Sequence, residues 1–260
     1  MAATCPASFD VALLRRHVRE TYTALAEEPG GDFHFHRGAA YAVALLGYDA
    51  AELSALPGEA TDAFAGVGRP LAGGTLRRGA IVLDHACGAG TDLLLAARRV
   101  GPTGYAIGVD LTAAMVARAR RAASLASITN IDITQSPYEA LPVPDASVDV
   151  VLSNGVLNLA PDKPLVLAEV ARVLRSGGEL WIADVVVQRE LTLGVRSDAE
   201  LWAACVAGAL PEAELVSLLA TDFTSTRLVA RHDCFRGTSS ERRAAGDLHI
   251  GAITVAATRR

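Results

Sequence analysis

LDHACGAG, at residues 83–90, is the most informative motif of this sequence, and Asp110 follows its last glycine by twenty residues. Residues 81–84 are a short apolar run that enters this glycine-rich turn, and residues 93–99 follow with helical periodicity. Residues 105–109 form a second apolar run that ends at Asp110. This order of strand, turn, helix and strand predicts a βαβ unit with two parallel strands.

The same alternation of strands and helices continues to the end of the chain. Apolar runs predict further strands at residues 131–134, 148–152, 180–187, 227–230 and 250–257. Helices are predicted between them at residues 112–125 and 164–174. Because parallel neighbours require crossovers that pack helices on the sheet, we expect an α/β fold with a doubly wound, mostly parallel seven-stranded sheet.

Two regions outside this alternation favour helices. Residues 13–25 carry apolar side chains at helical intervals, and residues 41–56 return to a helical pattern that Gly47 interrupts. We therefore predict an N-terminal helical cap over residues 1–75 and a main domain over residues 76–260. A third helical pattern at residues 197–220 places a helical insertion at about residues 190–220.

Composition excludes several classes of protein. The 260 residues are 51% hydrophobic, and 24 basic against 29 acidic residues give a formal charge of −5. Such a chain lacks the positive field that attracts phosphate polymers, so we expect no nucleic-acid partner. It contains no stretch of about 18 apolar residues, which predicts a cytoplasmic protein with no membrane partner.

The cysteines give no sign of a metal site. Cys5, Cys87, Cys205 and Cys234 are widely spaced and form no CxxC pair. This spacing indicates neither a disulfide framework nor a structural zinc site, so no metal is predicted.

The glycine turn and Asp110 together predict a nucleoside cofactor site. Gly88 and Gly90 allow the backbone to approach a ligand closely, and an acid at the tip of the second strand can accept both hydroxyls of a ribose. A dinucleotide fingerprint needs a third small residue after the second glycine, whereas Leu93 stands there. Asp92 near the helix start would also repel a pyrophosphate, so a cofactor without phosphates fits better.

Several ordered motifs then make a family resemblance specific. The acid–x–x–Cys–Gly–x–Gly turn, the second strand ending in Val-Asp, and the segments at residues 139–159 and 169–180 resemble the class I S-adenosylmethionine methyltransferases, which have a Rossmann-like fold. More closely, YDAAELSALP, FAGVGRP, SNGVLNLAPDKP, WAACVAGALP and DCFRGTS resemble the arsenite methyltransferase family. The resemblance runs from about residue 40 to residue 240 and implies S-adenosylmethionine as the cofactor.

The resemblance also implies a role for each matching residue. The first strand and the glycine turn would hold the amino acid end of the cofactor, through Asp84, Ala86, Cys87, Gly88 and Gly90. The next two strand ends would hold the ribose and adenine, through Asp110, Leu111, Met115, Tyr138 and Glu139. Asn154 ends the fourth strand, where the transferring methyl group would point.

Two departures from the family pattern bear on the substrate. Gly155 stands where the arsenite family has a cysteine, and Pro137 stands where relatives often place an acid that accepts the adenine amino group. Trivalent arsenic binds soft thiolates, so the loss of one thiol favours another acceptor. We therefore predict methyl transfer to a small molecule at oxygen, nitrogen or carbon. Arsenite methylation, with Cys205 and Cys234 as thiols, is the alternative, and a non-catalytic binding protein is a second one.

Candidate catalytic residues lie in the predicted cap. Methyl transfer from a sulfonium needs positioning more than acid–base catalysis, but a general base near neutrality helps with hydroxyl or carbon acceptors. His36, in FHFHRG, is a candidate base, with a solvated loop histidine as the alternative. Tyr22 lies in a segment that resembles the family's cap helix, where a tyrosine approaches the cofactor; ordinary core packing is the alternative. The oligomeric state is open, with a homodimer as one option.

Overall fold

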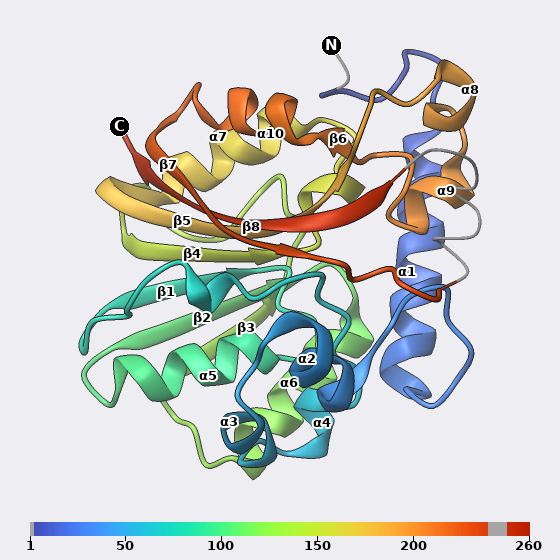
Figure 1. Cartoon of the computed structure of the whole chain (residues 1–260). Coiled ribbons are helices and arrows are strands. Elements are labelled where there is room, and N and C mark those ends of the chain that lie inside the picture. The colour runs from blue at the N-terminus through green and yellow to red at the C-terminus, as the bar shows by residue number, and fades with distance from the viewer. Residues whose placement is uncertain (1–2, 239–248) are drawn as a thin grey trace.

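One mixed sheet organises the chain in the computed structural model, which describes residues 3–238 and 249–260 (Figure 1). Its strands are β1 (Ile81–His85), β2 (Tyr105–Asp110), β3 (Ile131–Gln135), β4 (Val148–Asn154), β5 (Leu174–Val187), β6 (Leu210–Pro211), β7 (Phe223–His232) and β8 (Ile250–Arg259). Their order is β3-β2-β1-β4-β5-β8-β7, and the two-residue β6 pairs with β5. The first five strands are parallel, and β8 is antiparallel to both β5 and β7.

This sheet confirms the predicted doubly wound α/β fold. All seven predicted strands are present, and the structure adds the short β6. The fifth strand begins at Leu174 rather than at residue 180, because residues 174–179 also pair with β4, across a bulge between Val148 and Val150. No helix among residues 3–238 and 249–260 is long and apolar enough to cross a membrane.

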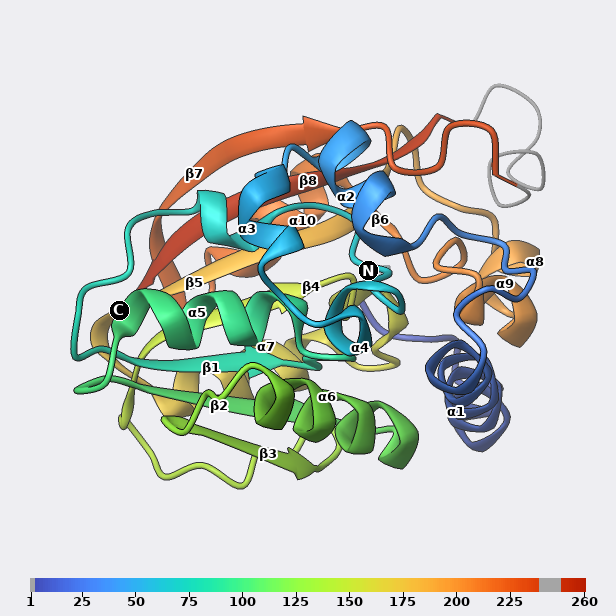
Figure 2. The ribbon, with the colours of Figure 1, turned by 90° about the horizontal axis from the view of Figure 1, so that it is seen from below.

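Helices cover both faces of the sheet, and each face has its own core (Figures 1 and 2). The helices are α1 (Val11–Glu27), α2 (Gly38–Leu46), α3 (Ala50–Ser54), α4 (Gly58–Thr61), α5 (Thr91–Val100), α6 (Ala113–Leu125), α7 (Lys163–Val173), α8 (Leu193–Arg196), α9 (Ala199–Ala203) and α10 (Glu212–Leu219), with 3-10 turns η1 (Pro70–Ala72) and η2 (Leu157–Leu159). The α5 and α6 face packs with α2, whereas α7 and α10 cover the opposite face.

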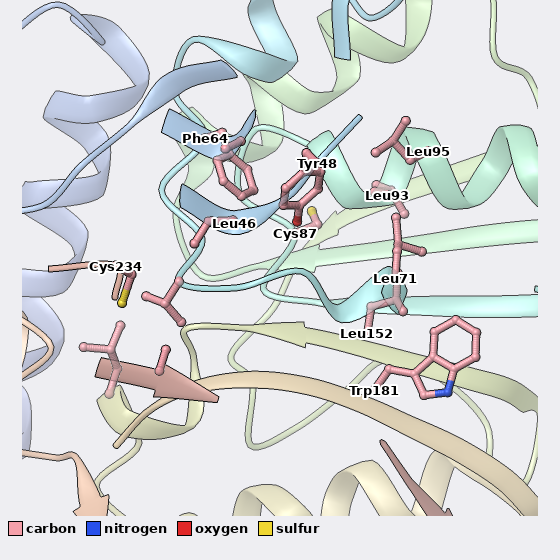
Figure 3. Close-up of a cluster of buried hydrophobic side chains, with 14 of the residues drawn as sticks. Leu46, Tyr48, Phe64, Leu71, Cys87, Leu93, Leu95, Leu152, Trp181 and Cys234 are labelled. Atoms are coloured by element: carbon pink, nitrogen blue, oxygen red, sulfur yellow. The ribbon is translucent and has the colours of Figure 1, made fainter. Parts of the chain in front are cut away.

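The N-terminal region contributes to the core of the α5 face. Figure 3 shows Tyr48 and Phe64 packed together close to Leu93 of α5. Gly47 ends α2 in left-handed backbone with φ of 74°, which breaks the helical pattern where the sequence predicts an interruption. The predicted boundary near residue 75, between the N-terminal cap and the main domain, stays a prediction.

The predicted insertion at residues 190–220 has a different form from the one expected. It contains the short helices α8 and α9, a turn, β6 and then α10, rather than one helical stretch over residues 197–220. Gly208 explains the break, because a Cβ there would lie 1.8 Å from the carbonyl oxygen of Asn158. The chain can pass this close to η2 only as glycine, so tertiary packing overrides the helical pattern.

Candidate active site

A cleft opens at the carboxyl ends of β1, β2 and β4, beside α1. It encloses about 760 Å³ of space, part of it open to solvent. Its cofactor-side lining consists of Asp84, Ala86, Cys87, Gly88, Ala89, Asp110, Leu111, Thr112, Met115 and Tyr138. Its other wall comes from α1, the 63–66 loop and the segment after β4, through Val18, Tyr22, Phe64, Gly66, Val156 and Leu159. The cleft therefore joins α1 and the 63–66 loop to the ends of β1, β2 and β4, at a strand edge where α/β folds bind ligands.

The glycine turn forms the floor of the cleft. Ala86 has a φ of 61°, which a residue with a side chain rarely adopts, and Gly88 has a φ of 53°. No atom lies within 4 Å of where a Cβ on Gly88 would stand, so this glycine leaves open space for a ligand. Gly90 has another role: a Cβ there would meet Leu94 at 3.0 Å, and the residue does not line the cleft.

Two buried carboxylates flank the turn. Asp110 accepts a hydrogen bond from the Gly88 amide at 2.9 Å through Oδ2 and one from the Thr112 amide at 2.8 Å through Oδ1. Asp84 is 3% exposed, and its Oδ2 is buried without a hydrogen-bond partner among the described residues. Burial raises the pKa of Asp84 well above its usual range, and the neighbouring Asp92 and Asp110 raise it further. A buried carboxylate with one unpartnered oxygen, beside two other carboxylates, is suited to a cationic ligand group.

The structure brings only some of the residues predicted for the adenine side to the cleft. Leu111, Met115 and Tyr138 line the cleft, and the Tyr138 hydroxyl donates to the Leu159 carbonyl at 3.3 Å. Glu139 does not line the cleft. Its carboxylate instead forms an ion pair with Arg15 of α1, with 2.8 Å between Nη2 and Oε1.

A buried polar network lies where β4 ends, beneath the 63–68 loop that borders the cleft. The Tyr48 hydroxyl donates to Asp92 at 2.8 Å, and the Asn154 side-chain amide donates to Asp92 at 3.0 Å. Asn154 also accepts the Val67 amide at 2.8 Å and donates to the Gly68 carbonyl at 3.0 Å. Asn154 lines the cleft, but most of its hydrogen-bonding capacity holds the 63–68 loop in place. The network was not predicted from sequence, although Tyr48 and the loop lie in the motifs YDAAELSALP and FAGVGRP.

The two predicted catalytic residues occupy different places. Tyr22 lines the cleft, and its hydroxyl is a hydrogen-bonding neighbour of the Cys205 thiol. His36 lies in a second groove lined by residues 29–40, where its Nε2 is 2.8 Å from the Arg236 carbonyl oxygen. Its ring is 5.1 Å from the ring of Tyr41. The structure therefore does not bring His36 to the cleft.

Two of the four cysteines, Cys205 and Cys234, are neighbours. Cys205 and Cys234 are buried and interact electrostatically, and burial raises the pKa of both, that of Cys205 to about 12. Cys205 has a φ of 61°, a strained conformation for a residue with a side chain. Within residues 3–238 and 249–260, no group of three or more histidine, cysteine or acidic side chains could hold a metal ion.

Comparison with known proteins identifies the family. A family model described as a methyltransferase domain matches residues 76–230. Arsenite methyltransferases from Halobacterium salinarum and Aquipseudomonas alcaligenes are 40% and 39% identical over 67% and 51% of this chain. These segments are 44% and 40% of the two relatives, so the chain spans less than half the length of either.

A solved structure shares both fold and sequence. The arsenic(III) S-adenosylmethionine methyltransferase from Chlamydomonas reinhardtii matches with a TM-score of 0.66 and 33% identity, over 79% of this chain and 71% of that one. This match agrees with the mixed sheet of mostly parallel strands described above. The chain therefore belongs to the class I S-adenosylmethionine-dependent methyltransferases, with S-adenosylmethionine as its cofactor and the arsenite methyltransferases among its relatives.

Proposed function

We propose that the chain transfers a methyl group to a nucleophilic oxygen, nitrogen or carbon atom of a small, largely apolar organic molecule. The observation that carries this proposal is the wall of the cleft beyond the cofactor positions. Val18, Phe64, Val156 and Leu159 form much of that wall. Such a surface favours an uncharged acceptor, because a charge buried there without a partner would be costly.

The residues on the other side of the cleft fit the cofactor. Bound S-adenosylmethionine supplies an electrophilic methyl group on a sulfonium, and it also carries an ammonium. The unpartnered Oδ2 of Asp84 is suited to accept that ammonium, and Asp110 retains lone pairs for ribose hydroxyls. Asp92 adds a third buried carboxylate, so the local charge complements a cationic ligand.

Tyr22 then acts by orienting the acceptor. Burial raises its pKa well above the usual range, so its hydroxyl stays protonated at neutral pH and donates or accepts a hydrogen bond. Because His36 lies outside the cleft, the acceptor does not depend on that base. The chain thus contributes position and exclusion of water, which a displacement at a sulfonium methyl group requires.

The test is a panel of acceptors with mass spectrometric detection of a product that has gained one methyl group. Phenols, amines and carbon acids are incubated with the protein and S-adenosylmethionine, and Asp110→Ala serves as the cofactor-binding control. We expect methylation of at least one apolar acceptor by the wild type and none by the variant. Micromolar cofactor binding with no product from any organic acceptor would contradict the proposal.

Arsenite is the second candidate acceptor, and a specific observation favours it. Cys205 adopts a strained backbone conformation and neighbours Tyr22, which lines the cleft, and Cys205 also raises the pKa of the Cys234 thiol. Two thiols would leave one arsenic valence for an external thiol, since Gly155 supplies none. Gly155 has a φ of 74°, which favours glycine over cysteine at this position.

The same assay separates the two candidates. Arsenite and glutathione replace the organic acceptors, and methylated arsenic is measured for the wild type, Cys205→Ser and Cys234→Ser. Cys5→Ser is the matched control, because the Cys5 amide donates to the Pro161 carbonyl, and the Cys5 thiol interacts with neither Tyr22 nor the other two thiols among the described contacts. Arsenic product that disappears in the first two variants and persists in the control would establish arsenite methylation. Equal turnover in all four proteins would show that neither Cys205 nor Cys234 takes part in the reaction.

A further inference from the structure

Lys163, the only lysine of the chain, is buried at the start of α7. Its side chain is among the largest that are fully buried, with 1% exposure. Its Nζ donates a hydrogen bond to the Ala160 carbonyl at 2.9 Å and lies 4.5 Å from the centroid of the Trp202 ring. A buried ammonium is costly, and an apolar side chain of similar size would often be more stable there. A lysine in this place therefore suggests a role other than stability.

Trp202 connects Lys163 to several elements. It is 1% exposed, and its Nε1 donates to the Arg196 carbonyl at 2.7 Å. Its ring is 5.1 Å from that of Phe9, which precedes α1. A Cβ on Gly208 would lie 2.7 Å from the indole, so the turn after α9 also packs against it. The Trp202 ring is therefore enclosed by α7, the segment before α1 and the turn after α9.

The two contacts of the Lys163 ammonium, the Ala160 carbonyl and the Trp202 ring, both belong to segments that adjoin the acceptor side of the cleft. α9 lies beside α1 in both views, and the chain reaches Cys205 two residues after α9 ends (Figures 1 and 2). The Cys205 thiol neighbours the Tyr22 hydroxyl, which lines the cleft. Ala160 directly follows Leu159, which also lines the cleft. A shift of the Lys163 ammonium would thus move both Tyr22 and Leu159 on the acceptor side of the cleft.

We propose that Lys163 is a positioning residue for methyl transfer: its ammonium, held between the Ala160 carbonyl and the Trp202 ring, keeps Tyr22 and Leu159 in place on the acceptor side of the cleft. This inference rests on the proposed function, because it assigns Lys163 to the acceptor half of that cleft. The cofactor half, built on the turn after β1, has no contact with Lys163 among those described above.

The charge on Lys163 depends on pH near neutrality. Its pKa is lowered to about 7, mainly by burial and in part by the Arg196 guanidinium on α8. Asp184 on β5, Cys5 in the N-terminal segment and Glu214 on α10 act in the opposite direction. The Ala160 carbonyl after η2 and the Trp202 indole of α9 also contact the ammonium, and neither of them carries a charge. The attraction between the ammonium and the ring is therefore strongest below about pH 7 and lost above it.

Two measurements test this contact and its effect without an acceptor. In a Trp181→Phe background Trp202 is the sole tryptophan, and its fluorescence should change between about pH 6 and about pH 9 with a midpoint near 7. Lys163→Met and Lys163→Arg should both abolish that transition. Lys163→Met should also raise the rate of Cys205 alkylation by a neutral maleimide about fivefold, and leave Cys87, the control thiol of the cofactor half, unchanged.

The third measurement uses whichever acceptor the wild type methylates. Lys163→Met should lower kcat/KM for that acceptor about tenfold and change the Kd of S-adenosylmethionine less than about twofold. Lys163→Arg, which stays charged, should restore activity and remove the decline above pH 7. If Lys163→Met does not fold, Trp202→Leu should reproduce its loss of kcat/KM.

The outcomes separate this inference from the proposed function. The positioning role would be overturned if Lys163→Met had both the Cys205 alkylation rate and the kcat/KM of the wild type. An equal loss of cofactor affinity would also overturn it, because it would show a general structural effect. If the wild type methylates no acceptor, the proposed function fails, and the alkylation and fluorescence results still decide whether Lys163 positions this wall.

Discussion

The two halves of the cleft are built in different ways. The cofactor half comes largely from two strand ends and the turns that follow them, so Asp84, Gly88 and Asp110 lie within one βαβ unit. The acceptor half comes from α1, the 63–68 loop and η2, with Cys205 behind Tyr22. Its parts meet only when the whole chain has folded.

This difference has a physical consequence. The cofactor half depends on backbone conformations that a few glycines permit locally, whereas the acceptor half depends on long-range contacts between buried polar groups. Tyr48, Asp92 and Asn154 hold the 63–68 loop, and Lys163 lies behind η2 and α9. A substitution in the first half should therefore affect cofactor affinity, and one in the second half should affect stability or acceptor turnover.

The largest effect is expected in the cofactor half. Asp110→Ala removes a carboxylate that accepts two backbone amides and that can bind the ribose hydroxyls. The loss of charge-assisted hydrogen bonds should raise the Kd of S-adenosylmethionine about 100-fold, or about 3 kcal/mol, as measured by titration calorimetry. The control is Asp132→Ala, an exposed carboxylate on the neighbouring β3. Equal affinity of both variants would show that Asp110 does not bind the cofactor.

The next effect concerns stability of the acceptor half as a function of pH. Lys163 has a lower pKa in the folded chain, about 7, than in the unfolded one, so the unfolded chain binds more protons between these values. The free energy of unfolding should therefore rise with pH, by about 1 kcal/mol between pH 7 and pH 8. Urea denaturation at several pH values measures this rise.

Lys163→Met is the control for that rise. Without the titrating group the slope should vanish, and the variant should be the more stable protein at pH 7. Measurements stop near pH 8, because folding raises the pKa of thiols such as Cys205, and stability falls once the pH passes their unfolded pKa of about 8.5. The same slope in both proteins would show that another group titrates.

The contrast between the halves also explains what could be predicted from the sequence. Strands and the glycine turn follow from local patterns, and Asp110 could be placed because the end of the second strand lies beside that of the first. Glu139 was expected beside adenine from its position in the chain, but its partner Arg15 lies on a helix over a hundred residues away. The contact between Lys163 and Trp202 could not be predicted from the local sequence either, since each residue alone is compatible with a helix.

A smaller effect is expected at the network under the 63–68 loop. Tyr48→Phe removes the hydroxyl that donates to Asp92, and it leaves this buried carboxylate with one donor fewer. The free energy of unfolding should fall by about 1–3 kcal/mol, while cofactor affinity changes less than about threefold. Tyr105→Phe, in which the lost hydroxyl belongs to an exposed side chain, should change neither quantity. A fall in cofactor affinity as large as that of Asp110→Ala would place this network in the cofactor half.

The smallest effect is expected where the two halves meet. Arg15 of α1 and Glu139 of the adenine side form an ion pair in which the Arg15 side chain is 40% exposed, so the pair is worth less than about 1 kcal/mol. Arg15→Met or Glu139→Gln should each increase the dissociation rate of S-adenosylmethionine less than about fivefold, as measured by stopped-flow fluorescence. The double variant then decides how Glu139 acts. If Glu139→Gln has no further effect once Arg15 is replaced, the carboxylate acts by holding α1 over the cofactor. If its effect is undiminished, Glu139 contacts the cofactor directly, as the sequence predicted, and the boundary between the halves lies on α1 itself.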